Sequence, residues 1–208
     1  MANLYHCHLY GILDLGYVAR DQVASVAREL VDGGVDLLQL RAKGFSKDDI
    51  AAMACQVQPI AKLAQVPFII NDHADIALAV EADGVHVGQD DDSVAEARAI
   101  VGDQAIVGKS THSLEQAHAA ANEPVDYIGF GPLFATPTKP EYTPIGLGDI
   151  AQVHVDLDIP IFCIGGVKKE NLPTIKAQGA QRGVIVSGIL QSSDKAAYIA
   201  ACQSILTQ

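Results

Sequence analysis

The sequence predicts a (β/α)₈ barrel, and three observations point to this fold. Eight short apolar segments alternate with helical patterns along the whole chain of 208 residues. Each strand-and-helix unit takes up about 26 residues, a spacing typical of repeated βα units. Several of the segments are apolar on both faces, as expected of parallel strands that helices cover on both sides.

The eight expected strands are rich in Ile, Val, Leu and Phe. They cover residues 9–13, 35–40, 68–70, 84–87, 106–108, 127–130, 161–164 and 183–186. A helical pattern separates each strand from the next, so we expect the strands to run parallel.

Two of the expected helices show a clear apolar face. Val23, Val26, Ala27, Leu30 and Val31 recur at the spacing i, i+3, i+4, i+7 and i+8, and Ile50, Met53, Ala54 and Val57 repeat in the same way. Residues at this spacing lie on one side of a helix, and we expect that side to pack on the strands.

Three helices should begin with a capping box, in which a serine side chain and a later acid or amide satisfy free backbone donors. The three spellings are Ser46-x-x-Asp49, Ser93-x-x-Glu96 and Ser113-x-x-Gln116. Each follows an expected strand, where a βα unit turns into its helix.

A doubly wound open sheet is the main alternative fold. A dinucleotide-binding sheet of that kind carries G-x-G-x-x-G after its first strand, and here that strand is followed by Asp14-Leu15-Gly16-Tyr17. No Ser/Gly linker divides the chain, so we expect one domain over residues 1–208. The longest stretch without a pattern, residues 131–148, follows the sixth strand, and an ordered loop of this length predicts a functional role.

Composition excludes several classes of protein. Apolar residues make up 49% of the chain, enough for a large core, and 14 Lys and Arg against 25 Asp and Glu give a net charge of −11. So acidic a chain is a poor partner for nucleic acid or anionic lipid. No apolar run approaches the length of about 18 residues that a membrane helix needs.

The chain start and the cysteines predict a cytoplasmic protein. The first residues, Met1-Ala2-Asn3-Leu4, lack the basic and apolar regions of a signal peptide. The four cysteines are Cys7, Cys55, Cys163 and Cys202, and no two of them form a C-x-x-C pair. We expect reduced thiols.

Chemistry-bearing residues gather where the strands end, the edge at which barrels of this kind build their sites. In chain order they are Gln39, Arg41 and Lys43; Asn71 and Asp72; Gln89, Asp90 and Asp91; Ser110, Thr111 and His112; Thr136, Thr138 and Lys139; Gly165 and Gly166; and Val186, Ser187 and Gly188.

Charge balance indicates what this edge could bind. A diphosphate ester carries about −3 near neutral pH. Three basic side chains (Arg41, Lys43 and Lys139) with two carboxylates (Asp72 and Asp91) and one divalent cation would neutralise it. Mg²⁺ is commonly held by one or two carboxylates together with phosphate oxygens. The sequence therefore predicts a Mg²⁺ site on Asp72 and Asp91 beside a diphosphate site.

A second phosphate site is predicted at the last two strands. Barrels often bind a phosphate there through backbone N–H groups and a helix N-terminus. The pair Gly165-Gly166 lets the backbone approach a ligand closely, and Val186-Ser187-Gly188 adds a hydroxyl.

Seven motifs in this order resemble the thiamine phosphate synthase family over essentially the whole chain. They are Gln39-Leu40-Arg41-Ala42-Lys43, Ile70-Asn71-Asp72, the run from Asp83 to Asp91, Gly108-Lys109-Ser110-Thr111-His112, the run from Tyr127 to Phe134 with Thr136-Pro137-Thr138-Lys139, Ile164-Gly165-Gly166-Val167, and Val186-Ser187.

The resemblance implies a transferase that joins a pyrimidine methyl diphosphate to a thiazole phosphate, with release of diphosphate, through a dissociative Mg²⁺-assisted substitution. It implies that the pyrimidine diphosphate is held by Gln39, Arg41, Lys43, Asn71, Ser110 and Lys139, with Arg41, Lys43, Ser110 and Lys139 catalytic. Asp72 and Asp91 would bind Mg²⁺. The thiazole phosphate would be held by Thr136, Thr138, Gly166, Val186 and Ser187.

Two other functions stay open. A thiazole tautomerase on the same barrel would use His112 for proton transfer and would not need Asp91. A non-catalytic protein that binds thiamine phosphate would also carry these motifs.

Several other residues are expected to be structural. We expect His86 to be a hydrogen-bonded core histidine, Cys163 to be a buried apolar residue, and Lys109 to point away from the site that Ser110 faces. The run from Tyr5 to His8 resembles a metal clip, but Cys7 would lie opposite the two histidines on an extended segment.

Overall fold

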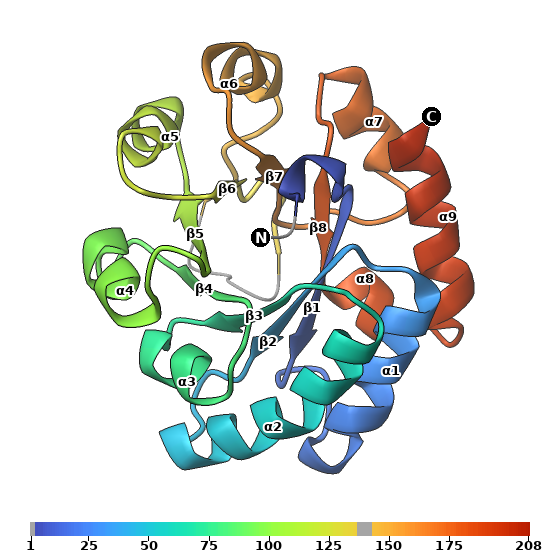
Figure 1. Cartoon of the computed structure of the whole chain (residues 1–208). Helices are drawn as coiled ribbons and strands as arrows, with labels where there is room; N and C mark the ends of the chain where they lie inside the picture. The colour runs from blue at the N-terminus through green and yellow to red at the C-terminus, as the bar shows by residue number, and fades with distance from the viewer. Residues whose placement is uncertain (1–2, 137–142) are drawn as a thin grey trace.

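The computed structural model describes residues 3–136 and 143–208, and its strands form a closed barrel in the order β1 to β8 (Figure 1). Every neighbouring pair is parallel, and β8 closes on β1 through the pairing of Leu9 with Gly183. The predicted (β/α)₈ barrel is confirmed.

The strands and helices alternate along the chain. The strands are β1 (Leu9–Asp14), β2 (Leu37–Arg41), β3 (Phe68–Asn71), β4 (Gly84–Val87), β5 (Ile106–Thr111), β6 (Tyr127–Phe130), β7 (Ile161–Cys163) and β8 (Gly183–Ile185). The α-helices are α1 (Val23–Gly33), α2 (Lys47–Leu63), α3 (Ala74–Ala79), α4 (Val94–Val101), α5 (Leu114–Ala121), α6 (Ile150–Asp156), α7 (Leu172–Ala177), α8 (Ser187–Leu190) and α9 (Lys195–Thr207). Two short 3₁₀ helices, η1 (Leu4–His6) and η2 (Arg20–Gln22), complete the described elements.

Two strands differ clearly from their predicted bounds. Strand β2 begins two residues later and ends one residue later than expected, so Arg41 lies within it. Strand β5 continues three residues beyond Gly108 to Thr111. Its polar end is stable as a strand because the side chains there have hydrogen-bond partners. Lys109 points outward to Glu123, with Nζ and Oε1 2.6 Å apart, and the buried Thr111 hydroxyl donates to the carbonyl oxygen of Gly129. Ser110 therefore lies within a strand and not after it.

The predicted helix faces and serine caps are present, but two of the three predicted capping boxes are incomplete. The five apolar residues singled out in the first helix are the buried residues of α1. Ser46, Ser93 and Ser113 each cap a helix by accepting from the backbone N–H three residues later. Only Ser93 completes the reciprocal box, through Glu96.

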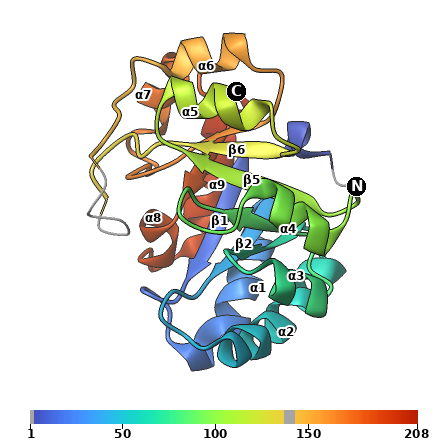
Figure 2. The ribbon, with the colours of Figure 1, turned by 90° about the vertical axis from the view of Figure 1, so that its left-hand side faces the viewer.

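Two apolar cores stabilise the barrel. The larger one lies between the strands and the surrounding helices. The smaller one fills the barrel interior and includes Tyr10, Tyr127 and Phe162. Leu4 and Cys7, at the ends of η1, belong to the interior core, so η1 covers the barrel end that lies opposite α8 (Figure 2).

Within the described ranges, the helices are all too short or too polar to cross a lipid bilayer.

Candidate active site

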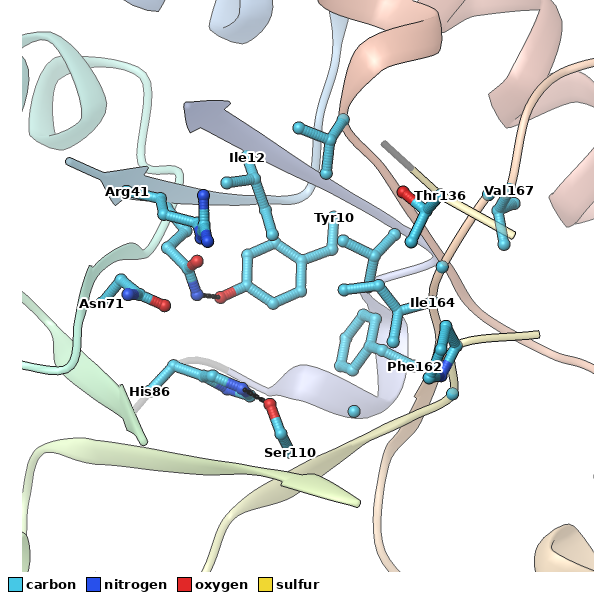
Figure 3. A pocket seen from close by; sticks show the side chains of 18 of the residues that line it. Tyr10, Ile12, Arg41, Asn71, His86, Ser110, Thr136, Phe162, Ile164 and Val167 are labelled. Atoms are coloured by element: carbon cyan, nitrogen blue, oxygen red, sulfur yellow. Dashed lines mark hydrogen bonds between the residues drawn. The ribbon is translucent and has the colours of Figure 1, made fainter. Parts of the chain in front are cut away.

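A pocket opens at the carboxyl ends of the strands, and most of the predicted site residues line it (Figure 3). They are Gln39, Arg41, Asn71, Ser110, Thr136, Gly166, Val186 and Ser187. Lys43, Asp72 and Asp91 form a separate charged cluster, which follows the ends of β2, β3 and β4. The predicted residues Thr138 and Lys139 lie outside the described residues.

Strand alternation explains why these side chains meet. Side chains two residues apart in a strand share a face, so Gln39 and Arg41 of β2 point to the same side. Parallel pairing places the inward positions of neighbouring strands side by side. Ile12 of β1 pairs with Gln39 of β2, and Asn71 of β3 pairs with His86 of β4. The inner face of the barrel therefore becomes more polar toward the pocket.

Arg41 is held by a carboxylate to which the sequence analysis assigned no role. One guanidinium nitrogen lies 2.6 Å from Oδ2 of Asp14, and both side chains are largely buried. The other oxygen of Asp14 accepts from the backbone N–H of Gly16 at 2.8 Å. Asp14 and Arg41 pair in register across β1 and β2, so this ion pair orients the arginine within the pocket wall.

Lys43 bridges the two predicted metal ligands. Its ammonium nitrogen lies 2.5 Å from Oδ2 of Asp72 and 3.8 Å from Oδ1 of Asp91. The carboxylates that the sequence predicts as a pair therefore reach a single cation. Lys43 is about half exposed, whereas Asp72 is 11% exposed at its side chain.

Local backbone geometry presents the two carboxylates. Asp72 has a φ of 66°, in the left-handed region that costs a residue other than glycine roughly 1–3 kcal/mol. Its N–H donates to the carbonyl oxygen of His86 at 2.8 Å, which ties β3 to β4 at this point. Asp91 turns back so that Oδ2 accepts from the N–H of Gly88 at 2.8 Å.

The electrostatics of this cluster favour a further cation. Burial alone would lower the pKa of Lys43, but the hydrogen bond and charge of Asp72, together with the charge of Asp91, raise it. Burial raises the pKa of Asp72 against the influence of Lys43, and the nearby Asp91 raises it further. Two carboxylates and one ammonium carry a net charge of −1, and this donor set fits Mg²⁺. Within residues 3–136 and 143–208, no group of three or more His, Cys, Asp and Glu side chains could hold a metal ion. Other oxygens must therefore complete any coordination at Asp72 and Asp91.

Gly165 and Gly166 line the side of the pocket that lies opposite Arg41 and Asn71, where the backbone packs closely. Both have positive φ values, 91° and 65°. A Cβ atom on Gly166 would lie 2.7 Å from the carbonyl oxygen of Ala135. Phe134 N–H donates to the carbonyl oxygen of Gly165 at 2.9 Å, so the segment after β6 is fastened to the end of β7. Only glycine suits these two positions.

Ser187 lies where β8 passes into α8, with Val186 immediately before it. Both residues line the same pocket as Gly166. The two ends of the pocket therefore differ in character: one carries Arg41 and Asn71, and the other is made of glycine backbone and a serine hydroxyl.

His86 and Cys163 are placed as expected of structural residues, and His112, the residue that a tautomerase would use, is held by hydrogen bonds. His86 hydrogen-bonds to Tyr127 and Ser110, as expected of a core histidine, and it also lines the pocket. Nδ1 of His112 lies 2.5 Å from the carbonyl oxygen of Gly131, while the backbone N–H of His112 donates to Gln116. Cys163 is completely buried.

Three residues of the site, Asp14, Tyr10 and Tyr127, have no predicted role in the sequence. The two tyrosines line the pocket floor, and alternation within β1 and β6 places them on the inward face. Tyr10 lies two residues before Ile12 in β1 and so shares its inward face, which the sequence could have shown. No local pattern in the sequence connects Tyr10 to Tyr127. Asp14 was visible at the end of the first strand, and its role follows from its register with Arg41.

Comparison with known proteins now decides the family. A family model described as thiamine monophosphate synthase matches residues 9–189. The chain belongs to the thiamine monophosphate synthase family.

Individual relatives agree with this assignment. The chain is 39% identical over 201 residues to a thiamine-phosphate synthase of Halalkalibacterium halodurans, covering 96% of this chain and 95% of the relative. It is 35% identical over 209 residues to one of Pelotomaculum thermopropionicum, covering 100% and 96%. Among solved structures, a thiamine phosphate pyrophosphorylase from Pyrococcus furiosus superposes with a TM-score of 0.86 at 27% identity, covering 97% and 96% of the two chains.

Family membership confirms the predicted class of enzyme, a transferase of the thiamine phosphate synthase kind. It does not favour the thiazole tautomerase or the non-catalytic binder.

Proposed function

We propose that this chain joins a pyrimidine methyl diphosphate to a thiazole phosphate, forming thiamine phosphate and releasing diphosphate, with Mg²⁺ as cofactor. The observation that carries the proposal is Lys43 between Asp72 and Asp91, beside a pocket that contains Arg41. Cations and carboxylates in this arrangement suit a reaction in which a multiply charged anion leaves.

The bond changes define what the protein has to do. The bond between the methylene carbon and the diphosphate oxygen breaks, and its electron pair leaves with the diphosphate. The lone pair of the thiazole nitrogen then forms the new carbon–nitrogen bond. The step requires neutralisation of the departing anion and alignment of two substrates, and it does not require a strong base.

Arg41 and Lys43 are the basic groups that would neutralise the diphosphate, with Gln39, Asn71 and Ser110 orienting the pyrimidine substrate. Arg41 is already oriented by Asp14, with 2.6 Å between nitrogen and oxygen. Lys43 is about half exposed and has the freedom to turn from Asp72 toward a bound anion. Lys139 would add a third positive charge.

Asp72 and Asp91 would hold Mg²⁺, which, when bound, neutralises charge on the diphosphate and helps it to leave. Their side chains meet the same ammonium group, which supports a shared cation. Two carboxylates plus substrate oxygens are the ligand set that Mg²⁺ usually takes.

The thiazole phosphate would bind at the other end of the pocket. Gly166, Val186 and Ser187 would approach its phosphate through backbone and hydroxyl groups, and Thr136 faces the same space. Thr138 would complete this site. Gly166 packs so closely against Phe134 and Ala135 that no side chain fits there. Its backbone would therefore face the ligand.

The direct test is to incubate the purified protein with both substrates and Mg²⁺ and to measure thiamine phosphate and released diphosphate. We expect equal amounts of the two products, and no product when either substrate is omitted or when EDTA is present. Tautomerisation of a thiazole carboxylate phosphate without the pyrimidine would favour the tautomerase instead. Tight binding of thiamine phosphate without turnover across metals would favour the binder.

A substitution of Asp91 tests whether this residue binds Mg²⁺. Asp91→Asn keeps an oxygen for the N–H of Gly88 but removes the charge, so turnover at limiting Mg²⁺ should fall by about a hundredfold. Asp92→Asn is the control, because Asp92 is exposed and adjacent in the chain. Wild-type activity of Asp91→Asn at limiting Mg²⁺ would exclude Asp91 as a ligand.

The described cysteines are free thiols, which supports the cytoplasmic setting that we propose for this enzyme.

A further inference from the structure

Five polar side chains from five different strands form an unbroken hydrogen-bond chain beneath the pocket. Nε2 of Gln39 lies 2.6 Å from the hydroxyl of Tyr10, and that hydroxyl lies 3.0 Å from the hydroxyl of Tyr127. The Tyr127 hydroxyl lies 2.9 Å from Nδ1 of His86, and Nε2 of His86 lies 2.9 Å from Oγ of Ser110. Figure 3 shows both ends of this chain, with His86 and Ser110 turned toward one another.

With a neutral His86, the donors and acceptors of these groups allow one continuous direction along the chain, starting from the amide nitrogen of Gln39. The amide nitrogen of Gln39 only donates, so the oxygen of Tyr10 accepts and its single proton goes to Tyr127. Tyr127 then donates to Nδ1 of His86. A neutral imidazole that accepts at Nδ1 carries its proton on Nε2, so His86 donates to Oγ of Ser110.

Because Tyr10 and Tyr127 are buried, reversing these hydrogen bonds would leave a buried hydroxyl proton without an acceptor. Tyr10 is 2% exposed and Tyr127 is completely buried, so neither hydroxyl can turn to bulk water. A buried hydroxyl without an acceptor loses stability. Burial also raises the pKa of both phenols far above the ordinary value, so each tyrosine keeps the proton that it donates.

The barrel makes room for this chain at a glycine of β5. A Cβ atom on Gly108 would collide with the ring and hydroxyl of Tyr127. At Gly129 of β6 a Cβ atom would lie 3.7 Å from the His86 ring, an ordinary contact. The two rings stack with their centroids 5.5 Å apart, and Phe162 packs edge-on against Tyr127 at 5.4 Å. Packing therefore helps to hold the Tyr127 and His86 rings at the centre of the chain.

We propose that Tyr10, Tyr127 and His86 are positioning residues that direct the hydroxyl proton of Ser110 into the pocket. Oγ of Ser110 accepts from His86, so its own proton is available to an acceptor atom of the substrate. The proposal rests on the proposed function, in which that acceptor is an oxygen of the departing diphosphate, whose negative charge grows as the bond breaks. The bond from His86 occupies one lone pair of Oγ and leaves the hydroxyl proton of Ser110 able to point to a substrate oxygen.

The first experiment reads the histidine directly and needs no turnover. The protein without substrate is labelled with ¹⁵N-histidine, and the His86 signals are assigned by comparison with the His86→Asn variant. At neutral pH we expect a neutral ring with the proton on Nε2 and a bare Nδ1. A proton on Nδ1, or a charged ring, overturns the proposal whether or not the protein makes thiamine phosphate.

The second experiment measures the consequence for catalysis. Tyr127→Phe removes the donor to Nδ1, so the two neutral forms of His86 should mix in the spectrum. kcat should fall about tenfold, while KM for the pyrimidine diphosphate changes less than about twofold. Tyr10→Phe leaves Tyr127 in place but removes its constraint, and we expect a smaller loss of about twofold to threefold.

The matched control is Tyr5→Phe. The Tyr5 hydroxyl also donates a hydrogen bond, at 2.9 Å to the carbonyl oxygen of Asp158, but it belongs to η1 at the far end of the barrel. We expect wild-type kcat and an unchanged His86 spectrum from this variant. Equal behaviour of folded Tyr127→Phe and Tyr5→Phe in both measurements would overturn the proposal. If Tyr127→Phe does not fold, the spectrum of Tyr10→Phe decides, since some shift toward Nδ1 protonation is required there.

Discussion

The ammonium nitrogen of Lys43 lies 2.5 Å from Oδ2 of Asp72, at the place where a divalent cation is proposed to bind. The same nitrogen is 3.8 Å from Oδ1 of Asp91, so one ammonium group partly neutralises both carboxylates. A metal ion bound there would compete with Lys43 for the same oxygens. A bound diphosphate changes this competition, because it gives Lys43 another anion to contact.

Replacing Lys43 should consequently have opposite effects on metal binding with and without diphosphate. In Lys43→Met without diphosphate, Mn²⁺ used as a probe should bind about threefold to tenfold more tightly, because a competing positive charge is gone. With inorganic diphosphate present, the variant should bind Mn²⁺ more weakly than wild type, because Lys43 no longer helps to hold the anion. Titration calorimetry measures both affinities.

Lys47→Met is the control for this experiment. Lys47 pairs with Asp75 at an exposed position, with 2.6 Å between Nζ and Oδ2. Its loss should leave both affinities unchanged. An unchanged Mn²⁺ affinity of Lys43→Met in the absence of diphosphate would show that Lys43 does not compete with the metal.

The Asp14–Arg41 pair should contribute to stability as well as to the site. Asp14→Asn leaves the largely buried Arg41 without its countercharge, so the free energy of unfolding should fall by about 2 kcal/mol. Inorganic diphosphate should restore part of this loss, because the anion replaces the missing carboxylate. Urea unfolding with and without diphosphate gives the comparison, and Asp21→Asn in η2 serves as an exposed reference. Equal unfolding midpoints for the two variants would contradict the prediction.

Ser187 should act on one substrate only. Ser187→Ala removes a hydroxyl from the predicted thiazole phosphate site, and loss of one hydrogen bond to a charged group should raise KM for that substrate roughly tenfold. KM for the pyrimidine diphosphate should not change. Steady-state kinetics with each substrate varied in turn measures the two values, with Ser204→Ala on α9 as control. A rise in both KM values would argue against a separate phosphate site at this end of the pocket.

The four cysteines should differ sharply in reactivity. Burial raises the pKa of Cys7 to about 11, with the charge of Asp36 acting in the same direction, and raises the pKa of Cys163 and Cys202 to about 12. Because the thiolate is the reactive form, only the exposed Cys55 should react quickly with iodoacetamide at pH near 8. Mass spectrometry of the digested, labelled native protein gives the order of labelling. Rapid modification of Cys163 in folded protein would contradict the packing of β7.

Much of the fold followed from local patterns. The period of two residues in the strands and of about 3.6 in the helices reports which faces are buried, and both periods are written in short stretches of sequence. The α1 face was predicted for this reason, and the three serine caps were predicted from the residue types at the helix starts. The predicted end of the fifth strand is wrong, because Lys109 and Ser110 interrupt the apolar run. Their side chains nevertheless point to opposite faces, as they do in a strand.

The sequence by itself determined the barrel, the family and the edge at which polar groups collect, since each of these depends on residue order and local spacing. Only the tertiary structure decided the partners. Arg41 pairs with Asp14 across two strands, Lys43 bridges two carboxylates from separate loops, and Tyr10 reaches Tyr127, which lies 117 residues away. These contacts depend on the register of neighbouring strands and on closure of the barrel, which bring distant residues within hydrogen-bond distance without leaving any periodic signal in the chain.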